Sequence, residues 1–139
     1  MEYVEEASKA KILRSCEELA RHGVRKNGDY LVDPDGELLS QDPIMVHCIF
    51  NEGPAITEIS HYHEKPIIVD HCDSKGCFEQ SIEYNVPLAQ IEALISLSES
   101  CSQHLDFGCF LAPLITNDDL LGGWKNRKGK RISLISVVL

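Results

Sequence analysis

Apolar residues recur at helical spacing in two stretches of the chain. The first stretch predicts a helix over 7–22, where acidic residues precede the start and Arg21 and His22 lie at the end, in the sense that the helix dipole favours. The second stretch predicts a helix over 87–101, because Pro87 suits a first helical turn and Asn85 is close enough to cap it. Its apolar face comprises Leu88, Ile91, Leu94, Ile95, Ser98 and Cys101.

Short runs rich in branched and aromatic residues predict strands between these helices. They cover 30–32, 44–50, 55–61, 66–70 and 78–86. The stretch Asp33-Pro34-Asp35-Gly36 is typical of a tight turn, since proline presets its φ and glycine suits its exit. We therefore expect an α+β fold in which an antiparallel sheet is packed against one main amphipathic helix, the helix over 87–101.

Length and charge narrow the functional classes. The chain has 139 residues and 43% hydrophobic residues, which is enough for one domain with its own core. Its net charge of −9 argues against a nucleic-acid partner, and its apolar runs are shorter than the roughly 20 residues of a membrane-spanning helix. One cationic run, Lys125 to Arg131, stands out; it is either a solvated loop or a contact for an acidic polysaccharide or anionic surface.

The six cysteines allow two interpretations. An even number suits a disulfide framework in an oxidising compartment, and arithmetic alone permits fifteen pairings. In a reducing compartment the same residues would be thiols or zinc ligands, as in an intracellular zinc-binding or thiol-bearing scaffold. The candidate zinc ligands lie within seventeen positions and include a His-x-His pair, which a strand presents on one face: His61, His63, His71, Cys72 and Cys77.

Catalytic and calcium-binding motifs are not apparent. We find no Gly-x-Ser-x-Gly elbow, no phosphate-cradling glycine-rich loop and no His-Glu-x-x-His helix, so we expect a non-enzymatic protein without a cofactor. Asp33 and Asp35 resemble the start of a calcium loop, but the sixth position, which requires glycine, is Leu38.

The stretch from Ser15 to Phe50 resembles the opening of a fibrinogen C-terminal-like domain. The shared pattern comprises a Ser-Cys-x-Glu helix at Ser15, a Gly-x-Tyr-x-x-Asp-Pro-Asp-Gly strand and turn at 28–36, and a hydrophobic-x-Cys-x-Phe strand ending at Phe50. The chain is most similar to the divergent form in contactin-associated, neurexin IV-type proteins. That form continues with a Tyr-Asn-Val segment, an amphipathic helix and a cysteine pair like Cys101 and Cys109.

The resemblance implies a disulfide pairing and a function. It implies Cys16 with Cys48 and Cys101 with Cys109, which leaves Cys72 with Cys77. It also implies an extracellular interaction or adhesion module, secreted or part of a cell-surface ectodomain, with a protein or glycan partner.

The resemblance predicts one fibrinogen-like domain over 1–139. It divides into a small disulfide-tied helix-hairpin subdomain, 7–50, and a sheet-plus-helix subdomain, 51–139, without the usual C-terminal ligand-binding subdomain. We expect the apolar end, Arg131 to Leu139, either to replace the closing strand of the central sheet or to be an exposed tail of a truncated piece.

Overall fold

The computed structural model describes residues 11–36, 41–74, 76–108, 110–111, 115–116, 119–120 and 122–132. These residues form two compact units. Unit 1 lies within Met1–Pro66 and Ser81–Ser102, and unit 2 lies within Ile67–Gln80 and Gln103–Leu139. The predicted α+β class with an antiparallel sheet is confirmed. Neither of the two helices among the described residues has the length and apolar character needed to cross a bilayer.

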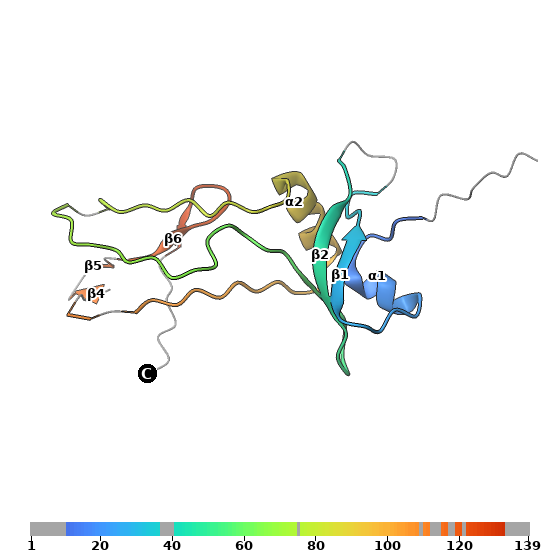
Figure 1. The fold of residues 1–139 in the computed structure, drawn as a ribbon. Coiled ribbons are helices and arrows are strands. Elements are labelled where there is room, and N and C mark those ends of the chain that lie inside the picture. Colours follow the sequence, from blue (N-terminus) through green and yellow to red (C-terminus); the bar gives the residue numbers. More distant parts are fainter. Residues whose placement is uncertain are drawn as a thin grey trace, which may run out of the picture. The chain divides into compact units, whose positions relative to one another are not determined.

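A three-stranded antiparallel sheet forms the centre of unit 1 (Figure 1). Its strands are β1 (Gly28–Val32), β2 (Ile44–Ile49) and β3 (Ile56–Glu58), in the order β1-β2-β3. The predicted strands at 30–32 and 44–50 are therefore present. The turn after β1 closes with a hydrogen bond from the Gly36 N–H to the Asp33 carbonyl, and the φ of 89° at Gly36 is one that glycine adopts without strain.

Helix α1 (Cys16–Arg21) begins later than the sequence predicts. Ser15 adopts an extended conformation and its hydroxyl accepts a hydrogen bond from the Glu18 N–H, which makes it the N-cap. Among the described residues before it, 11–15 are not helical, so the prediction of a helix from residue 7 is wrong there. The capping geometry explains the difference, because an N-cap residue leaves the helical conformation.

The core of unit 1 lies between α1 and the inner face of the sheet. Alternate residues of β2 are buried, as period-2 patterning requires. The fully packed cluster comprises Cys16, Val32, Ile44, Val46 and Cys48. Across the sheet, on the opposite face, Leu31 and Met45 are direct neighbours and stay exposed. The inner face therefore supplies the hydrophobic stabilisation of this unit.

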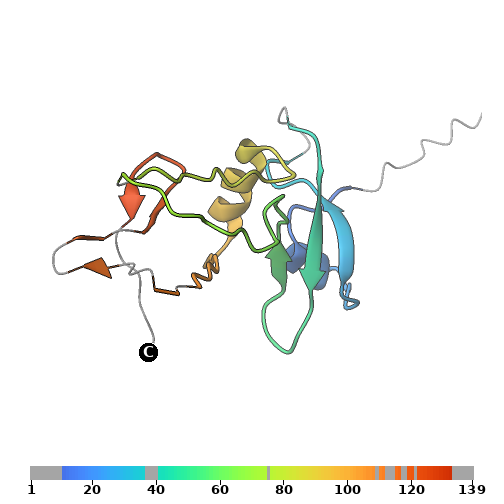
Figure 2. The same ribbon diagram turned by 60° about the vertical axis from the view of Figure 1, so that its left-hand side comes forward.

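Helix α2 (Leu88–Leu97) occupies the predicted place but buries an unexpected residue. Pro87 is its N-cap in an extended conformation, and the helix ends at Leu97, short of the predicted residue 101. Leu94 is buried, whereas Leu88 is 52% exposed. Gln90 is fully buried. Figure 2 shows α2 from a second side.

Three of the predicted strands are shortened or missing. The strand predicted over 55–61 is reduced to β3, and 66–70 and 78–86 are irregular apart from one bridge between His61 and Tyr84. Pro66 cannot donate to a ladder, and Ile68, at 87% exposure, has no sheet to cover. Apolar composition alone was therefore a poor predictor of strands here.

Unit 2 contains short ladders and a disulfide between Cys72 and Cys77. β4 (Ile115–Thr116) pairs with β5 (Asp119–Leu120), and β6 (Trp124–Lys125) pairs with β7 (Arg131–Ile132). Because Arg131 and Ile132 pair with β6, their prediction as part of a closing strand of the central sheet is wrong. Residues 133–139 lie outside the described residues.

Candidate functional site

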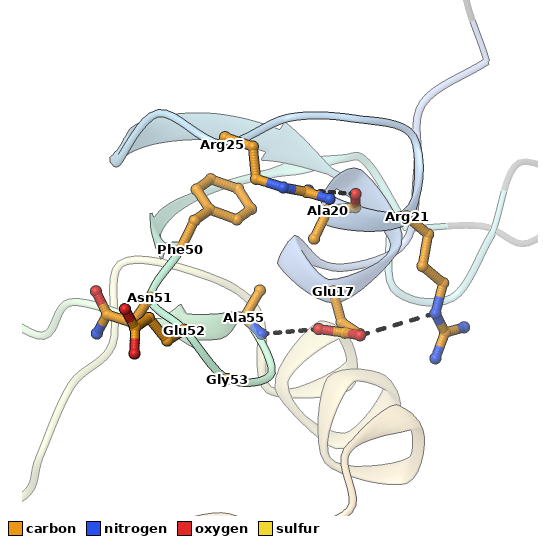
Figure 3. Close-up of a pocket in the computed structure, with 9 residues that line it drawn as sticks. All are labelled: Glu17, Ala20, Arg21, Arg25, Phe50, Asn51, Glu52, Gly53 and Ala55. Carbon is orange, nitrogen blue, oxygen red and sulfur yellow. Dashed lines mark hydrogen bonds and ion pairs between the residues drawn. The ribbon is translucent and has the colours of Figure 1, made fainter.

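A pocket of about 350 Å³ in unit 1 is the candidate site (Figure 3). Helix α1 provides one wall, and the connection from β2 to β3 provides the opposite wall. Its nine lining residues include two glutamates, two arginines and one aromatic residue. They are Glu17, Ala20, Arg21, Arg25, Phe50, Asn51, Glu52, Gly53 and Ala55.

Three tertiary links fix the α1 wall. The Cys16–Cys48 disulfide joins the first residue of α1 to β2, with Cα atoms 5.5 Å apart and both side chains fully buried. The Cys16 N–H donates to the Thr57 hydroxyl at 3.2 Å, and the Ala55 N–H donates to the Glu17 carboxylate at 2.7 Å. A helix of six residues is unstable alone, so these links determine its position.

The C-terminal end of α1 lines the part of the pocket that is drawn at the top of Figure 3. The Val24 N–H bonds to the Leu19 carbonyl and the Gly23 N–H to the Ala20 carbonyl, which is a Schellman ending with glycine at φ 96°. The Arg25 guanidinium donates to the carbonyls of Ala20 and Val24. Its positive charge therefore lies at the negative end of the helix dipole.

Phe50 provides the aromatic surface of the pocket. Its N–H donates to the Asn27 amide oxygen at 2.7 Å, and its ring meets Tyr30 edge to face with centroids 5.9 Å apart. The Tyr30 hydroxyl in turn donates to the Lys26 carbonyl at 2.6 Å. The Phe50 ring is therefore held in place by β1 and by the segment before it.

The lining chemistry suits binding. Carboxylates at Glu17 and Glu52 and guanidinium groups at Arg21 and Arg25 can meet charged groups of a partner, and Phe50 can contact its apolar surface. No serine, threonine, cysteine or histidine is among the nine described residues of this lining, so it holds no hydroxyl, thiol or imidazole group.

The predicted cysteine sites have different surroundings. Cys16 and Cys48 are joined beside the pocket, and Cys72 and Cys77 are joined in unit 2 with Cα atoms 6.1 Å apart. Cys101 is exposed and is not disulfide-bonded to any described residue. Its expected partner, Cys109, lies outside the described residues, so this pairing stays a prediction.

The alternative zinc site is not assembled. The thiols of Cys72 and Cys77 are consumed by their disulfide, and a disulfide sulfur is not a thiolate ligand. The His61 Nδ1 accepts a hydrogen bond from the His63 N–H at 3.1 Å, and the His71 ring pairs with Asp73. The described residues contain no group of three or more His, Cys, Asp or Glu placed to hold a metal ion.

A buried polar network at the tight turn was not predicted from the sequence. The Gln90 amide donates to the Asp33 carboxylate at 3.1 Å and to the Asp42 carbonyl at 2.8 Å, and it accepts from the Asp35 N–H at 3.1 Å. Burial raises the pKa of Asp33; the Gln90 hydrogen bond opposes this rise and the nearby Asp35 carboxyl adds to it. The spacing of Gln90 from Leu94 put it on the buried helix face, which was the available signal.

Comparison with known proteins supplies the family context. Over 102 residues, 73% of this chain, the sequence is 37% identical to Neurexin-4 of Drosophila melanogaster. Over the same length it is 28% identical to Contactin-associated protein 1 of Homo sapiens and 29% identical to that of Rattus norvegicus. The chain is homologous to these proteins over this length. It spans 8% of the first relative and 7% of the other two. No family model and no solved structure matches.

The homology and the disulfides both indicate an extracellular location. The relatives are cell-surface adhesion proteins, and disulfides persist in oxidising compartments. The chain is therefore an extracellular domain.

Proposed function

We propose that this chain is a non-catalytic interaction module of an adhesion protein and that it binds a protein partner through the pocket between α1 and the β2–β3 connection. The observation that carries the proposal is the disulfide-tied helix, since Cys16–Cys48 holds α1 opposite the β2–β3 connection. A wall fixed in this way loses little conformational entropy on binding, which favours affinity.

The charges of the pocket favour a partner surface that is itself of mixed charge. Glu17 is engaged by the Ala55 N–H and by Arg21, at 3.8 Å, so its charge is partly matched within the molecule. Glu52 is exposed on the opposite wall. We infer that Glu52 contacts a cationic group of the partner next to the ring of Phe50.

The ectodomain of contactin is the first candidate partner, because the mammalian relatives are named for their association with it. The test measures binding of the oxidised 139-residue protein to that ectodomain. Glu52→Lys is expected to weaken binding at least tenfold, whereas Glu64→Lys, the same charge change at an exposed position outside the pocket, is expected to leave it unchanged. No binding by the wild type, or equal binding by both variants, would contradict the proposal.

We further infer that unit 1 is the opening part of a fibrinogen-like module. The support is that the residues carrying that resemblance form α1, β1, the tight turn and β2 in order, with Cys16 joined to Cys48. An experimental structure of the oxidised protein would test this inference. A different connectivity after β3 from that of fibrinogen-like domains would contradict it.

A further inference from the structure

Unit 2 contains a cationic hairpin. It consists of β6, β7 and the turn between them, drawn in orange to red in Figures 1 and 2. Five of the chain's 13 lysines and arginines lie in it: Lys125, Arg127, Lys128, Lys130 and Arg131. The seven positions from 125 to 131 contain no acidic residue, on a chain whose net charge is −9.

The backbone of this turn is held by Asn126. Its amide oxygen accepts from the N–H groups of Lys128 and Lys130, at 3.0 and 2.9 Å. Its backbone N–H donates to the Lys130 carbonyl and its carbonyl accepts from the Gly129 N–H. Gly129 takes a φ of 75°, which suits glycine. The backbone that carries Arg127, Lys128 and Lys130 is therefore held by these hydrogen bonds.

Two of the charges at the tip of the hairpin, those of Lys128 and Lys130, have no ion pair among the described residues. The Lys125 ammonium contacts both oxygens of Glu79 at 3.0 Å, so this charge is neutralised at the base. Arg127, Lys128 and Lys130 are exposed. A local positive field in an acidic molecule implies an anionic ligand.

We propose that this hairpin binds a sulfated polysaccharide of the cell surface or matrix. The chain is extracellular, whereas anionic lipids face the cytoplasm, so a membrane is a poor candidate. Arginine pairs with tetrahedral oxyanions through two parallel hydrogen bonds, and repeated sulfates match several cations in a row. Trp124, 40% exposed, adds a ring on which a sugar can pack.

The proposal rests on the extracellular location and not on the protein partner of the pocket. Its test is retention of the oxidised 139-residue protein on immobilised heparin, with desulfated heparin as the comparison. The variant is Arg127→Gln/Lys128→Gln/Lys130→Gln. The matched control, Lys11→Gln/Lys26→Gln/Lys65→Gln, removes the same charge from exposed positions of unit 1.

We expect the wild type to bind heparin and not to bind desulfated heparin. The hairpin variant should bind at least tenfold more weakly, while the control binds like the wild type. The slope of log affinity against log salt concentration should be smaller in magnitude by about 2 to 3 for the hairpin variant. Asn126→Ala, which keeps every charge but releases the turn, should bind with intermediate affinity.

Three outcomes would overturn the proposal. They are no retention of the wild type, equal losses in both triple variants, or tighter binding to phosphatidylserine vesicles than to heparin. Thermal unfolding of each variant, followed by circular dichroism, establishes that it is folded. The hairpin variant should still bind contactin through the pocket, so the two proposals fail separately.

Discussion

The side-chain amide of Gln90 donates to the buried carboxyl of Asp33, 57 positions earlier in the chain. This contact joins α2 to the turn that connects β1 with β2. The same amide serves two backbone groups, the Asp35 N–H and the Asp42 carbonyl. One fully buried polar residue therefore satisfies three groups of the turn region.

Replacing Gln90 by alanine should destabilise the protein by roughly 2 to 3 kcal/mol, because buried polar groups are left without partners. Urea unfolding followed by circular dichroism would measure the change. Ser96→Ala, an exposed position of the same helix, is the control and should cost less than about 0.5 kcal/mol. Equal stability of the two variants would mean that the network contributes nothing.

Asp33 should give the stability a specific pH dependence. Its pKa is raised above the ordinary value of 3.8, so between pH 3.8 and the raised pKa the folded state holds a proton that the unfolded state has lost. The free energy of unfolding contributed by this group is therefore highest below 3.8 and decreases as the pH rises through the raised pKa. The difference between wild type and Asp33→Asn should follow this decrease.

The measurement is urea unfolding of both proteins from pH 3 to pH 8. Asp42→Asn, at an exposed position close to the turn, controls for the loss of one negative charge. If the free energy of unfolding of the wild type, minus that of Asp33→Asn, rose with pH in place of falling, the assignment would be contradicted.

The Cys16–Cys48 disulfide should contribute about 3 to 4 kcal/mol, since it closes a loop across a separation of 32 residues. Cys16→Ser/Cys48→Ser should lower the urea midpoint of unit 1 accordingly. Cys72→Ser/Cys77→Ser, which opens a loop across a separation of 5, should have a smaller effect. A larger effect of the second pair would contradict this ranking.

Ser15 should stabilise α1 through its cap. Ser15→Ala removes the acceptor for the Glu18 N–H and should cost about 1 kcal/mol, whereas Ser15→Gly should cost only a few tenths. Thermal unfolding of the three proteins would measure both values. If alanine and glycine were equivalent, the hydroxyl would not act as a cap.

Local signals predicted the parts of the fold that local chemistry determines. The Asp33-Pro34-Asp35-Gly36 turn, with alternating residues on both sides, was sufficient to place β1 and β2. The start of α1 was available in principle, since Ser15 and Glu18 have the spacing of a capping box. The longer apolar pattern outweighed it and extended the predicted helix.

Features that depend on distant segments were not predictable from local patterns. The stretch at 66–70 has strand composition, but a strand also requires a neighbouring strand that composition does not specify. The pocket lies between α1 and residues 50–55, which are linked by the Glu17–Ala55 hydrogen bond across 38 positions of the chain. Gln90 is polar, and the usual rule places polar residues outside.

The position of Gln90 along the chain has a consequence for biosynthesis. Helix α1, the three strands and both cysteines of the Cys16–Cys48 bridge are all made before residue 59, so oxidation can precede the synthesis of α2. Until Gln90 emerges from the ribosome, the Asp33 carboxyl has no amide partner and remains hydrated. If oxidation comes first, the nascent chain is covalently locked while its turn is still open to water, and the arrival of α2 then covers the turn.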